Sequence, residues 1–150
     1  MGLYQWNSFW RMSMLPKMTK LLKTQEGFKS KAYKDVYGNW TIGYGTNLES
    51  GISTYEAEAM MFARIRAIED KLENVIIGWY HLDPIRRDVL VNMAYNMGIE
   101  GLLGFTDLRY CIANQDMTGA AEAMLDSHWA RVDVGPRATY LADIMRGDRG

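Results

Sequence analysis

The sequence has almost none of the residues that bind metals or form disulfides. Cys111 is its only cysteine, so no disulfide can form within the chain. Cys111 lies in the apolar run YCIA, which predicts a buried small hydrophobic side chain. The two histidines, His81 and His128, lie far apart without Cys or carboxylate partners at ligand spacing. We therefore expect no metal site and no cofactor.

Net charge is also nearly absent. The formal charge is −1 and the isoelectric point is about 6.1, which argues against a general nucleic-acid-binding protein. The charge is unevenly distributed, however. Residues 1–48 carry seven Lys or Arg and two acidic residues, whereas residues 49–126 carry six and thirteen. A basic N-terminal part suits an anionic polymer as substrate, and ordinary solvated lysines are the alternative interpretation.

A long apolar run is missing as well. Residues 1–17, MGLYQWNSFWRMSMLPK, are rich in aromatic residues and Met but lack the segment order and small-residue cleavage site of a signal peptide. Arg11 and Pro16 interrupt the segment, so we expect no stable membrane span. Three interpretations stay open: an interfacial or partner-binding segment, a packing appendage, or residues that precede the start of the domain.

The remaining chain is long and apolar enough for one domain, since 48% of 150 residues are hydrophobic. Residues 17–27 have helical spacing, and Gly27 is a stop signal, which places Glu26 on the last turn. Alternation over residues 31–46 around Gly38-Asn39 predicts a β-hairpin. We expect a third short strand near residues 47–52.

The sequence after the hairpin predicts helices only. Ser53 and Glu56 form a capping box that begins a long helix reaching Gly78, of a length suited to a strut between two lobes. Further helix signals follow: Asp83-Pro84 as a start and Gly98 as an end, Thr106 and Thr118 as N-caps, and a last helix Arg137–Arg146 between Gly135-Pro136 and Gly147. Strands at one end and helices elsewhere indicate an α+β fold.

The stretch from Glu26 to Thr46 brings together the groups that glycoside hydrolysis needs. A general acid must protonate the glycosidic oxygen, and a second, ionised carboxylate must attack the sugar or orient water. Glu26 and Asp35 supply both if the hairpin folds back against the helix end. Thr41 lies across the turn from Asp35 and can hold the attacking water. The alternative is that a Glu at a helix end and an Asp beside a turn are surface residues.

The string Glu26-x8-Asp35-x5-Thr41, followed by Ile42-Gly43-Tyr44-Gly45, resembles the catalytic signature of phage-type lysozymes, the T-even-like muramidases used as endolysins. Further motifs of the family follow in order over residues 18–147: Asn92 to Gly98, Gly104-Phe105-Thr106, Trp129, Pro136-Arg137, and Met145-Arg146-Gly147. The resemblance implies a lysozyme-like fold. A small β-hairpin lobe at about 18–52 is joined by a helix at about 53–78 to a helical lobe at about 79–150.

The resemblance also implies an activity and its residues. It implies hydrolysis of the β-1,4 bond between N-acetylmuramic acid and N-acetylglucosamine, with inversion, so that the two carboxyls lie about 6.5–9.5 Å apart. Glu26 would be the general acid, and Asp35 and Thr41 would position the water. The substrate-binding residues implied are Gly45, Tyr95, Asn96 and Arg137, with Arg137 near Glu26. Core packing is the alternative for Tyr95.

The sequence departs from many relatives at one pair of positions. Thr46 stands where they have His, and Arg64 stands where some have the acid that pairs with it. A structural ion pair of the family is therefore not expected here, which bears on stability more than on catalysis.

The implied setting is that of a phage lysis protein. We expect peptidoglycan as the substrate, a monomer, accumulation in the host cytoplasm without a signal peptide, and a separate holin-type protein for release. Two alternatives remain: a lytic transglycosylase, and a virion-associated lysozyme-like protein docked through residues 1–17. The Asp35 and Thr41 pair weighs against the first, because transglycosylation needs no partner that orients water.

Overall fold

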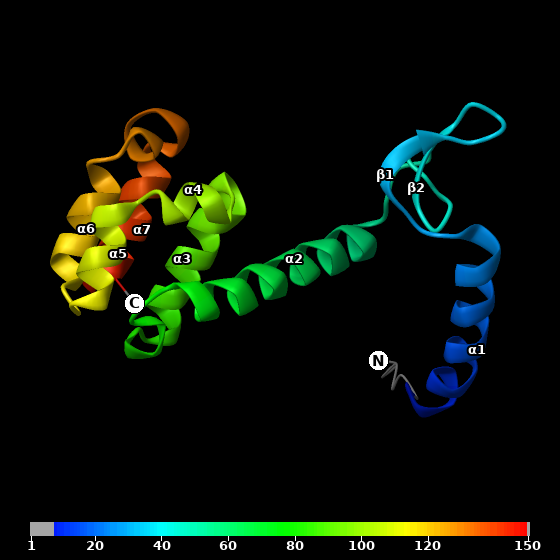
Figure 1. Cartoon of the computed structure of the whole chain (residues 1–150), viewed down its shortest axis with the longest axis horizontal. Coiled ribbons are helices and arrows are strands. Elements are labelled where there is room, and N and C mark those ends of the chain that lie inside the picture. Colours follow the sequence, from blue (N-terminus) through cyan, green and yellow to red (C-terminus); the bar gives the residue numbers. More distant parts are fainter. Residues whose placement is uncertain (1–7, 150) are drawn as a thin grey trace, which may run out of the picture. The chain divides into compact units, whose positions relative to one another are not determined.

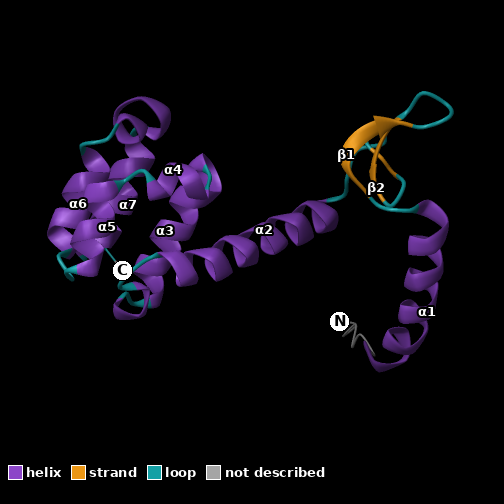
Figure 2. Ribbon diagram, in the orientation of Figure 1, coloured by secondary structure: helices purple, strands orange, loops and turns teal. Residues whose placement is uncertain are grey.

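The computed structural model describes the backbone of residues 8–149 and the side chains of residues 16–149. Contacts divide the chain into two units, Met1–Ala57 and Glu58–Gly150, and each is described by itself. The first unit holds all the strands found in the described residues, and the second is helical (Figures 1 and 2). The predicted α+β arrangement is confirmed.

The first unit begins with helix α1, Ser8–Glu26. The helix ends where the sequence predicts, at Gly27, whose φ of +67° suits glycine. It begins earlier than predicted and contains Pro16, so residues 8–17 are continuous with the turn that carries Glu26. Trp6, one of the aromatic residues of the predicted extension, lies outside the described residues.

A three-stranded antiparallel sheet follows in the order β1-β2-β3, with β1 at Lys29–Lys34, β2 at Trp40–Gly43 and β3 at Thr46–Asn47. Tyr33 lies opposite Thr41, and a bulge separates this pair from the pair of Lys29 and Gly43. The predicted hairpin is confirmed. Strand β3 is shorter than expected because the Asn47 side chain accepts the Glu49 N–H at 2.8 Å and turns the chain.

Helix α2, Thr54–Val75, begins at the predicted capping box. The Glu56 N–H donates to the Ser53 hydroxyl at 3.2 Å, and the Ser53 N–H donates to the Glu56 carboxylate at 2.8 Å. The helix ends before Gly78, and a 3₁₀ turn, η1 at Trp79–His81, follows. Gly78 has a φ of +89°, and a Cβ there would lie 2.9 Å from the Ile112 carbonyl oxygen, so this turn requires glycine.

The second unit packs its helices around one apolar core (Figure 1). Its further elements are α3 (Pro84–Met97), α4 (Ile99–Leu103), α5 (Thr106–Ala113), α6 (Met117–Leu125), a π-helix η2 (Trp129–Val134) and α7 (Pro136–Arg146). The predicted starts at Pro84 and Pro136 and the predicted ends at Gly98 and Gly147 are confirmed. Fully buried side chains from several helices form the core: Leu72, Leu90, Met93, Leu108, Met124 and Met145.

Two predicted helix caps are wrong. Thr106 is the first residue of α5, and the N-cap position is Phe105. Helix α6 begins at Met117, because the carboxylate of Asp116 accepts the Gly119 N–H at 2.8 Å and takes the capping role predicted for Thr118. Helix α6 ends at Leu125, and Trp129 opens the π-helix.

Arg86 joins the start of α3 to the end of α7. Its Nε donates to the Met145 carbonyl at 2.7 Å and its Nη2 to the Arg146 carbonyl at 3.3 Å, so it satisfies carbonyls that the helix end leaves unpaired. The same guanidinium pairs with Asp83, the N-cap of α3. In the part of the chain that the structure describes, none of the helices is both long and apolar enough to cross a bilayer.

Candidate active site

Glu26 is the last residue of α1, and the bend after strand β2 is held against this helix end. The Tyr44 ring contacts Phe28, with ring centroids 5.3 Å apart, and the ammonium of Lys23 lies 5.6 Å from the Tyr44 centroid. Aromatic and cation–π contacts of this kind fix the bend rather than the carboxylate itself. The bend is therefore positioned from the same helix that carries Glu26.

Gly45 lies against the carboxylate of Glu26. A Cβ at position 45 would be 3.0 Å from Glu26 Oε2 and 3.5 Å from its carboxyl carbon. Gly45 also has a φ of +81°, a conformation that side-chain-bearing residues rarely adopt. The predicted site residue Gly45 thus meets the predicted catalytic Glu26, and the absence of a side chain is what permits this contact.

Asp35 begins the hairpin turn, and both of its carboxylate oxygens are engaged. Oδ1 accepts the backbone N–H groups of Tyr37 and Asn39, each at 2.9 Å, and Oδ2 accepts from the Asn39 side chain at 3.3 Å. These bonds, led by the Asn39 backbone N–H, together outweigh the opposing effect of burial and hold the pKa of Asp35 below its ordinary value. Asp35 is therefore an ionised carboxylate under neutral conditions.

Thr41 lies on the same face of the hairpin as Asp35. Thr41 pairs directly with Tyr33, and Asp35 is two residues beyond Tyr33, so the alternation of side chains makes the two residues diagonal neighbours. The Thr41 side chain is only 4% exposed, and its hydroxyl donates to the Asn39 carbonyl at 3.3 Å. Its oxygen lone pairs remain available as acceptors.

Glu26, Asp35, Thr41 and Gly45 all belong to the first unit. Their predicted roles in catalysis and substrate binding stay predictions. The expected carboxyl separation of about 6.5–9.5 Å stays a prediction. Sequence reasoning missed Asn39 as the partner of Asp35; an Asn in the turn after an Asp was the available signal.

Tyr95 and Arg137 come together in the second unit. They line a cavity of about 350 Å³ with residues of α2 and α3, including Met61, Ile65 and Asn92. The guanidinium of Arg137 donates to the side-chain oxygen of Asn92 at 2.6 Å, which fixes the head group against α3. Tyr95 is 42% exposed, so core packing does not account for it in this unit.

Asn96 follows Tyr95 but has a different neighbour. Its side-chain oxygen accepts the indole N–H of Trp129 at 2.9 Å. Trp129 is only 4% exposed, so this bond satisfies a buried donor that water cannot reach. Asn96 is absent from the lining of the cavity that contains Tyr95 and Arg137. Its predicted role in substrate binding stays a prediction.

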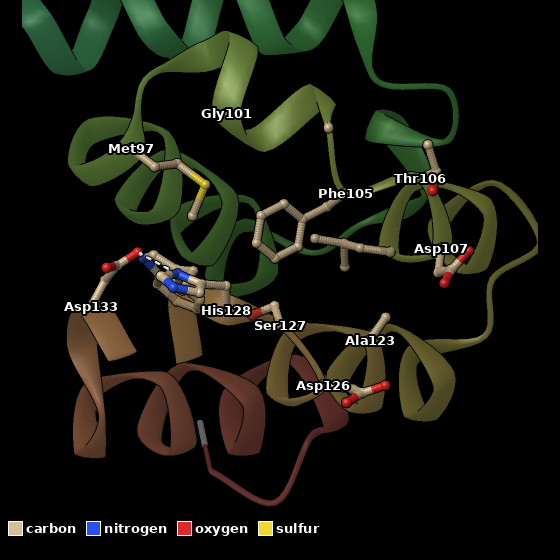
Figure 3. A pocket seen from close by; sticks show the side chains of 13 residues that line it. Met97, Gly101, Phe105, Thr106, Asp107, Ala123, Asp126, Ser127, His128 and Asp133 are labelled. Atoms are coloured by element: carbon tan, nitrogen blue, oxygen red, sulfur yellow. Dashed lines mark ion pairs between the residues drawn. The ribbon is translucent and has the colours of Figure 1, made fainter. Parts of the chain in front are cut away.

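A second cavity, of about 390 Å³, lies between the α4–α5 connection and the segment that links α6 to the π-helix (Figure 3). His128 and Asp133 point toward one another across one side of it, with Nδ1 and Oδ2 3.7 Å apart. Phe105 and Met97 provide apolar lining. None of the residues predicted to be catalytic or to bind substrate lines this cavity.

Within residues 8–149, no group of three or more His, Cys, Asp or Glu is arranged to hold a metal ion. Cys111 is half-buried, whereas the sequence predicts a buried side chain. Burial, followed by the charges of Asp116, Asp107 and Glu122, raises the pKa of its thiol. A thiol in that state is a poor nucleophile and a poor ligand.

Comparison with known proteins tests whether the chain belongs to the family that the signature suggests. A sequence model of the family described as phage lysozyme matches residues 23–140, which is more than half of the chain. The chain belongs to the phage lysozyme family. The sequence-based predictions of a phage-type lysozyme, and with it of an enzyme, are therefore confirmed.

Two curated relatives are similar to the chain over most of its length. An endolysin of Acyrthosiphon pisum secondary endosymbiont phage 1 is 26% identical over 139 residues, covering 90% of this chain and 92% of the relative. A probable T4-type lysozyme 1 of Dictyostelium discoideum is 25% identical over 146 residues, covering 77% and 86%. The phage lysozyme match begins at residue 23, after the segment predicted as an extension.

Proposed function

We propose that this phage lysozyme is an endolysin that hydrolyses the β-1,4 bond between N-acetylmuramic acid and N-acetylglucosamine of bacterial peptidoglycan, with inversion. The family and the endolysin among its relatives support the class of enzyme. The bond and the stereochemistry are proposed from the resemblance of the Glu26 to Gly45 signature to that of phage-type lysozymes.

The observation that carries the proposal is the unequal environment of two carboxylates in one unit. Asp35 accepts three N–H donors and is held ionised, whereas Glu26 accepts no hydrogen bond from the residues that the structure describes. Carboxylates in contrasting environments are how a glycosidase divides the roles of acid and base. A donor-rich Asp35 suits the base, which leaves Glu26 to supply the proton.

The proposed reaction is a single displacement. Glu26 donates its proton to the glycosidic oxygen as the bond from that oxygen to the anomeric carbon breaks. A water molecule attacks the anomeric carbon from the opposite face, and Asp35 accepts the proton that the water loses. Thr41 accepts a hydrogen bond from this water and so fixes its direction of attack. Glu26 ends ionised and Asp35 protonated, and solvent restores both.

Residues of the second unit are proposed to hold the sugar chain. Tyr95 offers an exposed aromatic face beside the cavity that Arg137 also lines, and aromatic faces with one polar group are typical of carbohydrate sites. Asn96 is included in the proposed substrate contacts, although its oxygen is bonded to Trp129.

Glu26→Gln tests the assignment of the acid, because an amide keeps the shape of the side chain and cannot donate a proton in this way. We expect it to abolish the release of reducing ends from purified peptidoglycan while leaving the circular dichroism spectrum and melting temperature unchanged. Glu49→Gln, an exposed change in the same unit, is the matched control. Undiminished turnover by Glu26→Gln would contradict the proposed role of Glu26 as the general acid.

Two alternatives have a specific basis. A lytic transglycosylase would use Glu26 alone, and the anchored Asp35 favours hydrolysis over it. A virion-associated lysozyme docked through residues 1–17 remains an alternative mode of use. Comparing residues 18–150 with the full chain in lysis and in oligomeric state tests it, and deletion of residues 1–7, which leaves α1 whole, is the second variant.

The setting of the enzyme is proposed from the resemblance. We propose that the protein is a monomer, accumulates in the host cytoplasm, and reaches the cell wall after a separate holin-type protein opens the membrane. Lysis of cells that express the protein with and without a membrane-permeabilising agent checks this order of events. Lysis without the agent would contradict it.

A further inference from the structure

In the hairpin turn, Asn39 donates hydrogen bonds to both carboxylate oxygens of Asp35. The backbone N–H of Asn39 donates to Oδ1 at 2.9 Å, and its side-chain amide donates to Oδ2 at 3.3 Å. Asn39 is half-buried, whereas Val36 in the same turn is 93% exposed. The side chain of Asn39 is thus directed to the carboxylate, while that of Val36 is exposed to solvent.

We propose that Asn39 is a positioning residue for hydrolysis, whose side-chain amide orients the Asp35 carboxylate so that Oδ2 receives the proton of the attacking water. The inference rests on the proposed function, since it assigns the accepting atom within that mechanism. Asn39 itself is not proposed to touch the substrate.

The hydrogen bonds distinguish the two oxygens of Asp35. Oδ1 accepts two backbone N–H groups, from Tyr37 and Asn39, and a carboxylate oxygen has about two lone-pair sites. Oδ2 accepts one donor from the described residues, the Asn39 amide, and keeps one lone pair. Oδ1 is therefore the anchored atom and Oδ2 the atom with room for a water proton.

The turn itself does not depend on the Asn39 side chain. The Asp35 N–H donates to the Asn39 carbonyl and the Gly38 N–H donates to the Asp35 carbonyl, both at 3.0 Å. Every residue except proline at position 39 retains its backbone N–H and carbonyl. Replacing the Asn39 side chain should therefore remove the hydrogen bond to Oδ2 of Asp35 and leave the hairpin closed.

The electrostatic setting agrees with this assignment. The backbone N–H of Asn39, and after it the side-chain amide, lower the pKa of Asp35, and the N–H groups of Tyr37 and Gly38 add to this. The charged side chain bonded into the same turn is Lys34, whose ammonium donates to the Gly38 carbonyl at 2.9 Å. Losing the Asn39 amide removes a donor that favours the ionised form.

Two readouts test the inference in the full chain: the pH dependence of kcat on purified peptidoglycan, and the NMR titration of the Asp35 carboxyl carbon. For Asn39→Leu we expect kcat to fall about three- to tenfold with KM unchanged, because one charge-assisted bond is lost. The acidic limb of the kcat profile and the Asp35 titration should both move to higher pH. Val36→Ala, in the same turn, should have the same pH profile of kcat and the same Asp35 titration as the wild type.

Asn39→Asp is the second variant, which keeps the size of the side chain but adds a negative charge beside Asp35. This variant should raise the pH at which Asp35 titrates further than Asn39→Leu does. If Asn39→Leu folds poorly, Asn39→Asp still tests the inference. A titration and pH profile unchanged in both variants would overturn the role of Asn39. Asp35→Asn separates this outcome from failure of the mechanism: if that variant turned over normally, the proposed function itself would fall.

Discussion

Gly45 and Glu26 are in direct contact, since a Cβ on Gly45 would lie 3.0 Å from the carboxylate oxygen Oε2 of Glu26. The contact ties the bend after β2 to the last turn of α1. It also gives a physical reason for a glycine at this position of the signature. A side chain at this point would move the group proposed to protonate the substrate.

The first prediction concerns Gly45→Ala. Displacing the Glu26 carboxylate by a few tenths of an ångström should lower kcat by at least about tenfold, because misplaced catalytic groups lose orientation. The measurement is kcat on purified peptidoglycan beside the melting temperature.

The matched control for this substitution is Gly51→Ala. Gly51 has a φ of +73°, close to that of Gly45, but nothing lies within 4 Å of the position its Cβ would take. Both variants should therefore lose similar stability through backbone strain, and only Gly45→Ala should lose activity. Equal losses of kcat would mean that the contact with Glu26 is irrelevant to the reaction.

The second prediction concerns Asn96. Asn96→Ala leaves the buried indole N–H of Trp129 without its partner, which should lower the free energy of unfolding by about 1–3 kcal/mol. Chemical denaturation measures this loss, and a double-mutant cycle with Trp129→Phe isolates the bond. Asn114→Ala, which removes an exposed side-chain bond to the Tyr110 carbonyl, should change stability by less than about 0.5 kcal/mol.

The same variant decides between two roles for Asn96. A positioning role toward Trp129 predicts lost stability with KM unchanged near room temperature. A direct contact with the sugar predicts a raised KM with stability retained. A raised KM with unchanged stability would show that the main role of Asn96 is not its hydrogen bond to Trp129.

The third prediction concerns pH and Asp83. Burial opposes ionisation of this carboxyl, but the N–H and guanidinium of Arg86 outweigh it and lower the pKa of Asp83. A lowered pKa adds stability above the ordinary Asp range of about 3.9, and this stability is lost as pH falls through the lowered value. Asp83→Ala should therefore cost about 1 kcal/mol near neutral pH and progressively less in acid.

Asp83→Asn separates the cap from the charge. Asn is also a good N-cap, so this variant should keep most of the stability at neutral pH and lose the dependence on pH. Urea midpoints measured across the acidic range provide the comparison. Asp70→Ala, an exposed change on α2, is the control and should have little effect at any pH. A cost for Asp83→Ala that grows in acid would contradict the linkage.

Local signals predicted the parts of this fold that local chemistry determines. The capping box at Ser53, the Asp83-Pro84 start and the Gly147 stop are each set by a few adjacent residues, and each is confirmed. The cap at Thr118 failed because Asp116, two positions earlier, takes the capping role, and the cap at Thr106 failed because α5 begins one residue earlier than predicted, after Phe105, which makes no side-chain cap bond. At α6, Asp116 reaches the Gly119 N–H because Gly119 has no Cβ in the way.

The candidate site was predictable to the same extent. Sequence spacing and the family resemblance single out Glu26, Asp35 and Thr41, whose roles stay predictions, and the hairpin register explains why the last two share a face. Their partners were not predictable from spacing. The amide of Asn39 on Asp35, and the bond between Asn92 and Arg137 across 45 residues, depend on side-chain directions that only the folded units define.

Product analysis of digested peptidoglycan tests the central proposal most directly. Purified peptidoglycan is digested to completion with the wild-type chain, the products are reduced, and the new chain ends are identified by mass spectrometry, with the anomeric configuration followed by NMR early in the reaction. We expect reducing N-acetylmuramic acid ends, released first in the α configuration. Anhydro-muramic acid ends, reducing N-acetylglucosamine ends, or first products in the β configuration would contradict it.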